Sequence, residues 1–400
     1  MRICFWVSSI ASVGGVQRVT SLIASELSNE NDIYILTEDS KENIQRNIYN
    51  TSSNIQIIES PNELKIFNNL PLFNKIVKRI NKITGILNNE KLYNICEKIY
   101  IPKRKKNILT NYFNKYNFDY IVGVQGDKSL LLASVSKQLK AKTIGWQHSS
   151  FDAYFKTKKM YFWNQDILFK KNLPNLDKYI VLNEHDSKKI NETFGINSTY
   201  IYNPFSFKSN GKTNMENKYF IAAGRFCTAK GFDIYLEAIK RFIEKKQDWK
   251  FFLIGDGEKN NSIQKIIREY KLSEYVITTG YVDNIQEYFS KSSVFVLSSR
   301  WEGMPMVALE SLAMGCPIIS FDISAMKPIV ENMKEGIIVE FDETGKNLSE
   351  AMLKLANNVE LRKKMQENAL KKSKVFSMDN IIKEWKKVFN SIKKEDNNEN

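Results

Sequence analysis

The chain has 400 residues, of which 42% are hydrophobic, so it is too long for one ordinary core and long enough for two domains. Its formal net charge is +14, and residues 61–118 contain 12 Lys/Arg against three acids. The four cysteines lie far apart and match no zinc or disulfide spacing, which argues against both frameworks and favours a reducing, cytosolic compartment. No apolar run reaches the ~20 residues that span a bilayer. We therefore expect a protein that is soluble or peripheral to a membrane.

Short apolar runs alternate with segments of helical periodicity in the first half, a pattern typical of a parallel sheet covered by helices. The first run, residues 3–7, could imitate a signal peptide, but it lacks a cleavage-like site, so we interpret it as a buried strand. The expected strands are residues 3–7, 32–36, 120–124, 142–146 and 178–182. The expected helices are residues 16–27, 129–139, 160–169 and 184–194, together with a basic helical stretch before residue 118.

The second half repeats this α/β pattern. The expected strands are residues 219–223, 250–254, 276–279, 294–297, 317–320 and 337–339, and residues 347–394 are expected to be helical. Residues 204–217 have the composition of a linker, which divides the chain into an N-terminal domain, 1–203, and a C-terminal domain, 218–375. Residues 376–400 form the last helix and a tail that we expect to be disordered after Glu395, because it carries nothing to bury.

The first candidate site is the segment 299–310, which follows an expected strand. Pro305 suits the first position of a helix, and Gly315 suits its end. Ligands of parallel sheets bind beyond the carboxyl ends of strands, where helix N-termini present free N–H groups. The amides near Gly303 and Met304 are therefore candidates to hold a phosphate or a sugar hydroxyl.

Two glutamates in this segment differ in position. Glu302 lies in the loop, and Glu310 lies in the helix among apolar residues. An ionised carboxylate in such surroundings needs hydrogen-bond donors, and a ribose diol would supply two. The alternative is that Glu310 lies on the helix surface and Glu302 caps the helix.

The second candidate site is the segment 222–231, again a strand end, a turn of small residues and a helix start. Arg225 and Lys230 would place two cations beside a helix N-terminus, which suits a diphosphate. The alternative is two solvated cations in a surface loop. After later strands, residues 255–257 form a glycine-rich turn, and Tyr281 with Val282 could face a nucleobase or pack in the core.

Three features of the first half are also candidates. Gly14 and Gly15, with Arg18 after them, join the first strand to the first helix and would let a substrate approach the backbone. This loop is not a dinucleotide fingerprint, and the acid that such a site needs is ambiguous between Glu38 and Asp39. His148 follows a strand beside Gln147 and Ser149, so it is either functional or structural. Asp127 also follows a strand, and could contact a substrate hydroxyl or cap the helix expected from Ser129.

These residues together resemble glycosyltransferase family 4, the retaining group 1 glycosyltransferases that use nucleotide sugars. The resemblance covers nearly the whole chain. It depends on Glu-x7-Glu at Glu302 and Glu310, on Gly224, Arg225, Lys230 and Gly231, on the Gly14-Gly15 loop with Arg18, and on His148. The sequence departs from the family over residues 323–330, where a glycine found in many members is absent.

The resemblance implies a GT-B fold, in which two Rossmann-like domains face each other and the C-terminal helix crosses back onto the first. It implies that Arg225 and Lys230 neutralise the donor diphosphate, that Glu310 binds the ribose, and that Glu302 with the Gly303 and Met304 amides positions the sugar. His148 would lie near the reacting sugar. Arg18, Asp127 and His148 are then expected on the acceptor side, and Gly14, Gly15, Gly224, Tyr281 and Val282 on the donor side.

We expect transfer of a hexose or an N-acetylhexosamine from UDP to a glycan or a lipid-linked acceptor, as in the assembly of bacterial surface polysaccharide or lipooligosaccharide. The chain contains no Asp-x-Asp, so neither a metal nor another cofactor is expected. Retention would need a carboxylate nucleophile or same-face attack assisted by the leaving phosphate, and the family favours the second.

The basic segment 65–115 mixes lysines with Ile, Leu, Phe and Tyr. This composition suits helices that lie on the anionic inner surface of the cell membrane. An ordinary solvated insert would have the same composition. Nucleic-acid binding is disfavoured because no recognition motif accompanies the charge. Two other functions remain open: a sugar-nucleotide epimerase of the same fold, and a non-catalytic partner protein.

Overall fold

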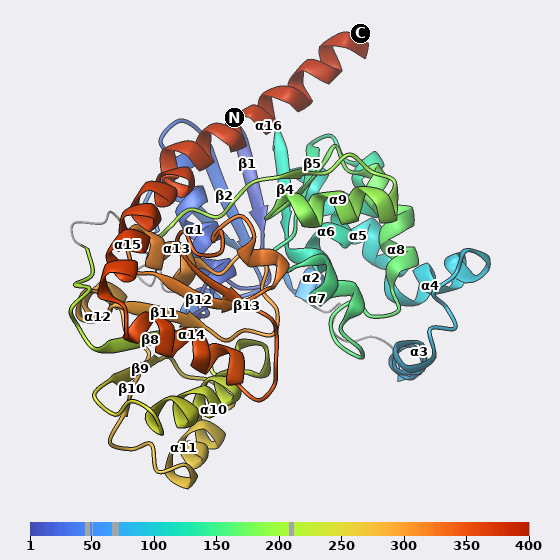
Figure 1. Ribbon diagram of the computed structural model, residues 1–400. Helices are drawn as coiled ribbons and strands as arrows, with labels where there is room; N and C mark the ends of the chain where they lie inside the picture. Colours follow the sequence, from blue (N-terminus) through green and yellow to red (C-terminus); the bar gives the residue numbers. More distant parts are fainter. Residues whose placement is uncertain (45–48, 50, 66–71, 208–211, 400) are drawn as a thin grey trace. The chain divides into compact units, whose positions relative to one another are not determined.

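The structure is a computed structural model that describes residues 1–44, 49, 51–65, 72–207 and 212–399. The chain forms two compact units. Unit 1 contains Met1–Tyr202 and Ile381–Asn400, and unit 2 contains Asn203–Asn380. Each unit is a parallel sheet with helices, as the sequence pattern predicts (Figure 1).

The sheet of unit 1 has the order β3-β2-β1-β4-β5-β6-β7, and all its paired strands are parallel. The chain reverses its direction of travel across the sheet between β1 and β4, which is where such sheets bind ligands. The strands are β1 (Arg2–Trp6), β2 (Asp32–Thr37), β3 (Gln56–Glu59), β4 (Tyr120–Val124), β5 (Lys142–Trp146), β6 (Lys178–Val181) and β7 (Thr199–Tyr200).

Unit 1 has helices beside this sheet, and most of them bury an apolar face around the strand residues Cys4, Ile121 and Val181. They are α1 (Gly15–Leu27), α2 (Asn62–Lys65), α3 (Leu72–Thr84), α4 (Tyr93–Tyr100), α5 (Lys103–Lys115), α6 (Gln125–Ala133), α7 (Phe151–Lys156), α8 (Asp166–Asn172) and α9 (Glu184–Phe194). The helix expected around residues 160–169 is present but begins later, at Asp166, as α8. Residues 157–165 form turns between α7 and α8, with positive φ at Lys159, Tyr161 and Asn164.

The last helix, α16 (Met378–Glu399), returns to unit 1, as the GT-B resemblance implies. Trp385 is fully buried there and lies 4.8 Å from Trp146 and 6.1 Å from Phe5, measured between ring centroids. The hydroxyl of Tyr120 donates to the carbonyl of Phe389. Figure 1 shows this red helix beside the blue β1. The tail was expected to be disordered after Glu395, but α16 continues to Glu399.

The sheet of unit 2 has the order β10-β9-β8-β11-β12-β13 and is parallel as well, with its reversal between β8 and β11. The strands are β8 (Tyr219–Ala223), β9 (Lys250–Ile254), β10 (Val276–Gly280), β11 (Val294–Leu297), β12 (Ile318–Phe321) and β13 (Gly336–Val339). The helices are α10 (Phe232–Ile243), α11 (Asn260–Glu269), α12 (Ile285–Lys291), α13 (Met306–Ala313), α14 (Lys346–Ala356) and α15 (Val359–Ser373). The region expected to be helical, residues 347–394, is helical apart from short breaks at residues 357–358 and 377.

The structure of the expected linker, residues 204–217, differs from what its composition predicts. Residues 208–211 lie outside the described residues, and the rest of the segment belongs to unit 2. Thr213 is buried, and its hydroxyl donates to the carbonyl of Gly315, while Gln366 donates to the Thr213 carbonyl. Arg362 donates to the carbonyl of Met215. Thr213 and Met215 are thus held to unit 2 by hydrogen bonds, in which the Thr213 hydroxyl is a donor and the two carbonyls are acceptors.

Candidate active site

The two central strands of unit 2, β8 and β11, position the main candidate residues. Gly224 and Arg225 follow β8, and the loop 298–305 follows β11. These strands are hydrogen-bonded neighbours. Their carboxyl ends flank the reversal of strand order, so both candidate segments predicted from the sequence meet at one edge of the sheet.

Lys230 and Glu302, which are 72 residues apart in sequence, form an ion pair at this edge. The Lys230 Nζ lies 2.6 Å from the Glu302 Oε1, and the hydroxyl of Ser299 donates to the same oxygen at 2.7 Å. The Glu302 side chain is 10% exposed and the Lys230 side chain 22% exposed. Helix α13 has Pro305 at its N-cap and no side-chain cap, so the alternative in which Glu302 caps this helix is wrong.

Gly231 lets the Lys230 turn approach the loop after β11. Its φ is +60°, and a Cβ at this position would lie 2.1 Å from the carbonyl oxygen of Ser298. The hydroxyl of Ser298 donates to the carbonyl of Lys230, and the amide of Arg300 donates to the carbonyl of Ala229. The backbone of one candidate segment is thus hydrogen-bonded directly to the other.

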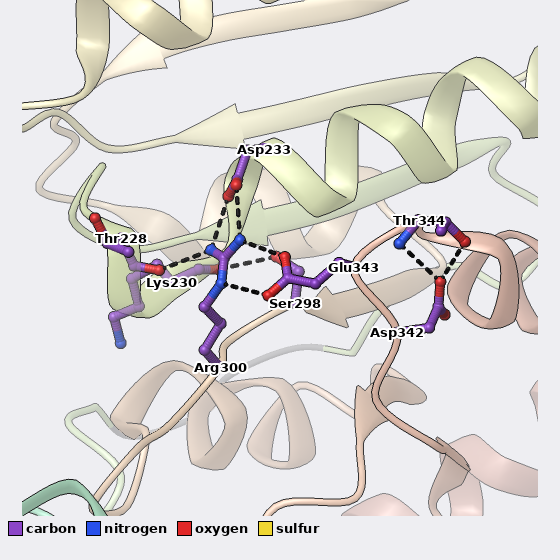
Figure 2. Close-up of polar contacts among 8 residues, drawn as sticks. All are labelled: Thr228, Lys230, Asp233, Ser298, Arg300, Asp342, Glu343 and Thr344. Atoms are coloured by element: carbon purple, nitrogen blue, oxygen red, sulfur yellow. Dashed lines mark hydrogen bonds and ion pairs between the residues drawn. The ribbon is translucent and has the colours of Figure 1, made fainter. Parts of the chain in front are cut away.

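Arg300 joins three segments around the site (Figure 2). Its guanidinium donates to both carboxylate oxygens of Asp233, at 3.0 and 2.8 Å, and to both of Glu343, at 3.3 and 2.7 Å. It also donates to the carbonyl of Thr228. Burial opposes ionisation of Asp233, but the hydrogen bonds from Arg300 outweigh it and lower the Asp233 pKa. We call these residues, Thr228, Asp233, Arg300 and Glu343, the Arg300 clasp, and sequence reasoning missed them because nothing in the local pattern pairs them.

Glu310 lies in the middle of α13 and is 1% exposed, so its placement on the helix surface is wrong. The hydroxyl of Ser206 donates to its Oε1. Met304 is also buried, and its carbonyl accepts from the side-chain amide of Asn203. Gly303 is buried beside it. The predicted helix stop at Gly315 is confirmed, with φ of +67° directly after α13.

The glycine-rich turn after β9 packs against the turn that carries Arg225. A Cβ on Gly255 would lie 2.0 Å from the carbonyl oxygen of Gly224, and the amide of Phe226 donates to the carbonyl of Asp256. This turn therefore needs glycine for close approach. Arg225 itself is exposed. Tyr281 after β10 is 51% exposed, so the alternative that it packs in the core is wrong, and Val282 is half-buried beside it.

In unit 1 the loop after β1 is held by Asp39. Its carboxylate accepts from the amides of Ile10 and Ala11 and from the hydroxyls of Ser9 and Thr37. Burial raises the pKa of this carboxyl, but these donors together lower it below the ordinary value. Asp39 thus has a structural role in shaping the loop that leads to the Gly14-Gly15 turn.

The Gly14-Gly15 turn begins α1. The amide of Gly14 donates to the hydroxyl of Tyr49, and the carbonyl of Gly14 accepts from the amide of Arg18 in the first turn of the helix. Gly15 has no atom within 4 Å of the position that a Cβ would take. The turn is therefore open at Gly15, as close approach of a substrate to the backbone would require.

Asp127 lies in the first turn of α6, which begins at Gln125 rather than Ser129, so Asp127 does not cap the predicted helix. Its carboxylate accepts from the hydroxyl of Ser8 after β1. The next residue, Lys128, is buried, pairs with Glu38 and lies 5.0 Å above the ring of Trp6. Sequence reasoning missed Lys128, which lies in the first turn of α6, because its partner Glu38 is 90 residues away in the sequence.

His148 follows β5 and is partly buried, with its ring 4.1 Å from that of Trp146 between centroids. Its Nε2 is buried and has no hydrogen-bond partner among the described residues. Burial lowers the His148 pKa to about 3, so the ring is neutral at physiological pH. Gln147 beside it has a structural role, because it accepts from Tyr179 and donates to the carbonyl of Ser149.

Three further findings concern the described residues of both units. All four cysteines are free, as their spacing indicates. Within the described ranges no helix has both the length and the apolar character needed to cross a bilayer. In the same ranges no three His, Cys, Asp or Glu side chains are grouped so that they could hold a metal ion.

Comparison with known proteins agrees with this geometry. Residues 205–372, which contain every candidate residue of unit 2, match the model of the family "Glycosyl transferases group 1". Most of unit 2 is thus similar to the group 1 glycosyltransferases. It is 26% identical over 394 residues to an uncharacterized glycosyltransferase of Haemophilus influenzae, covering 97% of this chain and 99% of that protein.

Two other similar proteins match this chain almost from end to end. One is the Campylobacter jejuni GalNAc-alpha-(1->4)-GalNAc-alpha-(1->3)-diNAcBac-PP-undecaprenol alpha-1,4-N-acetyl-D-galactosaminyltransferase, 25% identical over 98% of this chain and 99% of that protein. The other is a crystal structure of a S. aureus TarM mutant with fondaparinux, alpha-GlcNAc-glycerol and UDP. It is 16% identical with a TM-score of 0.76, over 97% of this chain and 99% of that chain, and this likeness confirms the GT-B fold.

Proposed function

We propose that this protein is a group 1 glycosyltransferase that moves a hexose or an N-acetylhexosamine from UDP to a glycan or lipid-linked acceptor, with retention of configuration, in the synthesis of bacterial surface polysaccharide or lipooligosaccharide. The observation that carries the proposal is the ion pair of Lys230 and Glu302 at the carboxyl ends of β8 and β11. A cation and a carboxylate held together at this edge offer one group to a diphosphate and another to sugar hydroxyls. We propose those two roles for them.

The proposed chemistry breaks the bond between the anomeric carbon and the diphosphate oxygen. The acceptor hydroxyl attacks the same face of the sugar, and its proton passes to the departing phosphate. Negative charge grows on the diphosphate as it leaves, and preorganised cations stabilise that charge most strongly in a dry site. Arg225 and Lys230 are the side chains that we assign to this task, with no metal or cofactor.

We assign to the remaining candidate residues the roles that the resemblance implies. Glu310, buried in α13 with Ser206 as a donor, would exchange or share that hydrogen bond with the ribose hydroxyls. Tyr281 is exposed after β10 and would contact the nucleobase with Val282. The buried N–H groups near Gly303 and Met304 would contact the donor sugar. Neutral His148, Asp127 and Arg18 are assigned to the acceptor side.

Similar proteins support the donor and acceptor classes. The S. aureus TarM structure contains UDP, which supports a UDP donor here. The C. jejuni transferase is named for an acceptor on PP-undecaprenol and for transfer of an N-acetylhexosamine, which supports a lipid-linked acceptor and such a sugar. A lipid-linked acceptor would place the enzyme at the cytoplasmic face of the cell membrane, where we propose it acts as a peripheral protein.

The decisive test incubates the purified enzyme with a panel of UDP-, GDP- and dTDP-sugars, with and without lipid extract as acceptor, and measures which free nucleotide is released. We expect release of UDP from one or two donors, stimulated by the extract and lost in Glu302→Ala. Conversion of a nucleotide sugar without release of nucleotide would indicate an epimerase instead. No turnover of any donor, in a protein that is folded, would favour a non-catalytic role.

A further inference from the structure

Helix α3 of unit 1 turns a stripe of large apolar side chains toward solvent. Figure 1 shows α3 and α4 at the periphery of unit 1, beyond α5, α6 and α8. The stripe consists of Leu72 (74% exposed), Phe73 (69%), Ile76 (50%), Ile80 (48%) and Ile83 (61%). At 3.6 residues per turn these positions lie within an arc of about 100°. We call this face the apolar stripe.

The opposite face of α3 attaches the helix to unit 1 mainly through polar groups. Asn81 is fully buried, and its side chain donates to the carbonyl of Asn164 and accepts from the amide of Leu87. The ammonium of Lys78 lies 4.7 Å above the ring of Tyr100 in α4. An ordinary surface helix buries its apolar face and exposes its polar one. Helix α3 does the reverse, and its hydrogen bonds fix it in that orientation.

Basic residues border the apolar stripe. Lys75, Arg79 and Lys82 fall on one side of it, between the stripe and the packed face, and α3 contains no acidic residue. Lys75 and Arg79 are exposed, and Lys82 is half-buried. The helix therefore offers a hydrophobic surface with a row of cations along one edge of it.

We propose that the apolar stripe of α3 docks into the surface of an anionic bilayer. A helix of this kind lies in the interface plane, with its apolar side chains among the upper acyl chains and its cations at the phosphate level. A second copy of the chain fits less well, because pairing two α3 helices would bring their cations together. A protein groove that binds this face would have to be both apolar and acidic. An anionic membrane has both properties, because its acyl chains are apolar and its headgroups carry negative charge.

Within the basic segment 65–115, this inference assigns membrane docking to a single helix, α3. In α5 the residues Leu109 and Phe113 pack into the core of unit 1, so α5 offers cations but no comparable apolar stripe. The inference rests on the proposed function in one respect, since a lipid-linked acceptor is what would make docking useful. The docking itself can be measured without any turnover.

The test is sedimentation of the full chain with vesicles of phosphatidylcholine alone and with vesicles that contain about 30 mol% phosphatidylglycerol. We expect the wild type to sediment with the anionic vesicles and far less with the neutral ones. The triple variant Phe73→Ser, Ile76→Ser, Ile80→Ser should lower partitioning by at least about tenfold at any salt concentration, because it removes the inserted area. Since these side chains are exposed, its thermal unfolding should match the wild type.

A charge variant measures the contribution of the cations separately from that of the apolar stripe. Lys75→Gln, Arg79→Gln, Lys82→Gln should lose most binding at physiological salt, where the remaining attraction is screened, and less at low salt. The matched control is Lys364→Gln, Lys371→Gln, Lys374→Gln, which removes the same charge from exposed positions of unit 2. That control should bind like the wild type.

Three results would overturn the proposal: no binding to anionic vesicles even at low salt, equal binding of the wild type and the Phe73, Ile76, Ile80 variant, or a dimer in sedimentation velocity that this variant abolishes. Turnover of the soluble donor is measured on every variant in parallel. Unchanged donor turnover with lost vesicle binding supports docking by α3. Absence of donor turnover in the wild type would instead count against the proposed function and leave the vesicle result to stand by itself.

Discussion

Arg300 and Asp233 form a bidentate ion pair, in which both terminal guanidinium nitrogens donate to the two carboxylate oxygens at 3.0 and 2.8 Å. Asp233 lies in the first turn of α10, and Arg300 lies two residues before Glu302. The pair therefore fixes the loop of Glu302 to the helix that follows Lys230. Isolated surface ion pairs contribute little to stability, but bidentate arginine pairs that belong to a network are the exception.

Arg300→Lys should impair catalysis more than folding. Lysine keeps the charge but cannot donate in a fork to Asp233 and Glu343, so the loop of Glu302 gains freedom. We expect kcat to fall about tenfold to a hundredfold, because small misplacement of catalytic groups is costly. The midpoint of thermal unfolding should fall by only a few degrees. Steady-state kinetics and calorimetry measure the two effects.

A double-mutant cycle tests whether Arg300 acts through Asp233. Asp233→Asn alone, and combined with Arg300→Lys, should give an interaction free energy of about 1 kcal/mol or more in unfolding experiments. Strict additivity of the two changes, together with wild-type kcat in Arg300→Lys, would show that the clasp has no part in positioning Glu302.

Lys230→Ala and Glu302→Ala should each remove transfer while the fold remains. Loss of one stabilising donor to a developing anion typically costs about 3–4 kcal/mol of barrier, a rate loss of 10² to 10³. Both side chains retain some access to water, so an unpaired partner can be solvated and unfolding should change little. Lys218→Ala, which breaks the exposed pair with Asp248, is the matched control and should turn over normally. Near-wild-type turnover in either site variant would contradict the assignment.

Gly231→Ala should be far more damaging than Gly195→Ala. Both glycines have positive φ, +60° and +67°, so both substitutions introduce left-handed strain of about 1–2 kcal/mol. Only at Gly231 would the new Cβ also meet a backbone atom, the Ser298 carbonyl oxygen at 2.1 Å; Gly195 has open space. We expect lower stability in both variants by urea unfolding, and loss of donor turnover in Gly231→Ala alone. Equal effects at the two positions would mean that strain alone matters.

His148 should make the protein less stable as the pH falls. Its pKa is about 3 in the fold, below its ordinary value of 6.5, so the unfolded chain binds a proton first. The resulting loss of unfolding free energy begins near pH 6.5 and reaches about 1.4 kcal/mol per pH unit until the folded pKa is reached. His148→Gln should remove that slope from urea unfolding between pH 4 and 6.5, with His185→Gln as the control. An unchanged slope in His148→Gln would show that the ring is not buried in solution.

Removal of divalent metal should leave transfer intact. Arg225 and Lys230 are assigned to offset the charge of the diphosphate, so the mechanism does not require a metal clamp. After dialysis against EDTA we expect donor turnover within about twofold of its starting value, a change too small for loss of a Lewis acid, which supplies several kcal/mol. Activity that disappears and returns on addition of Mg²⁺ or Mn²⁺ would show the prediction to be wrong.

The central strands could be predicted from the sequence because their signal is local. Residues 120–124, 142–146, 219–223, 250–254 and 294–297 are apolar runs flanked by turns, and each is a strand with those bounds. A strand buried on both faces is continuously apolar, so its position is recorded in a few adjacent residues. The edge strands β3 and β7 escaped prediction because they are short and partly exposed, and such strands carry little of that pattern.

The candidate loops could also be predicted, because they follow directly from those strands. The sequence by itself placed Glu302 in a loop and Glu310 in the helix after it, and both placements hold. It could not pair Lys230 with Glu302 or Arg300 with Asp233, since these partners lie 72 and 67 residues apart and no local pattern links them. Strand order in the sheet of unit 2 decides which loops become neighbours.

Helix α3 shows most directly the difference between what the sequence determines and what the tertiary structure decides. Its amphipathic spacing is determined by the sequence, but the composition of segment 65–115 left open whether its helices lie on a membrane or form an ordinary solvated insert. Only the tertiary structure decided that this face is turned to solvent, because Asn81 provides buried hydrogen bonds that attach the opposite side to unit 1. Periodicity specifies which residues share a face, whereas the partners that satisfy the buried polar groups decide where that face points.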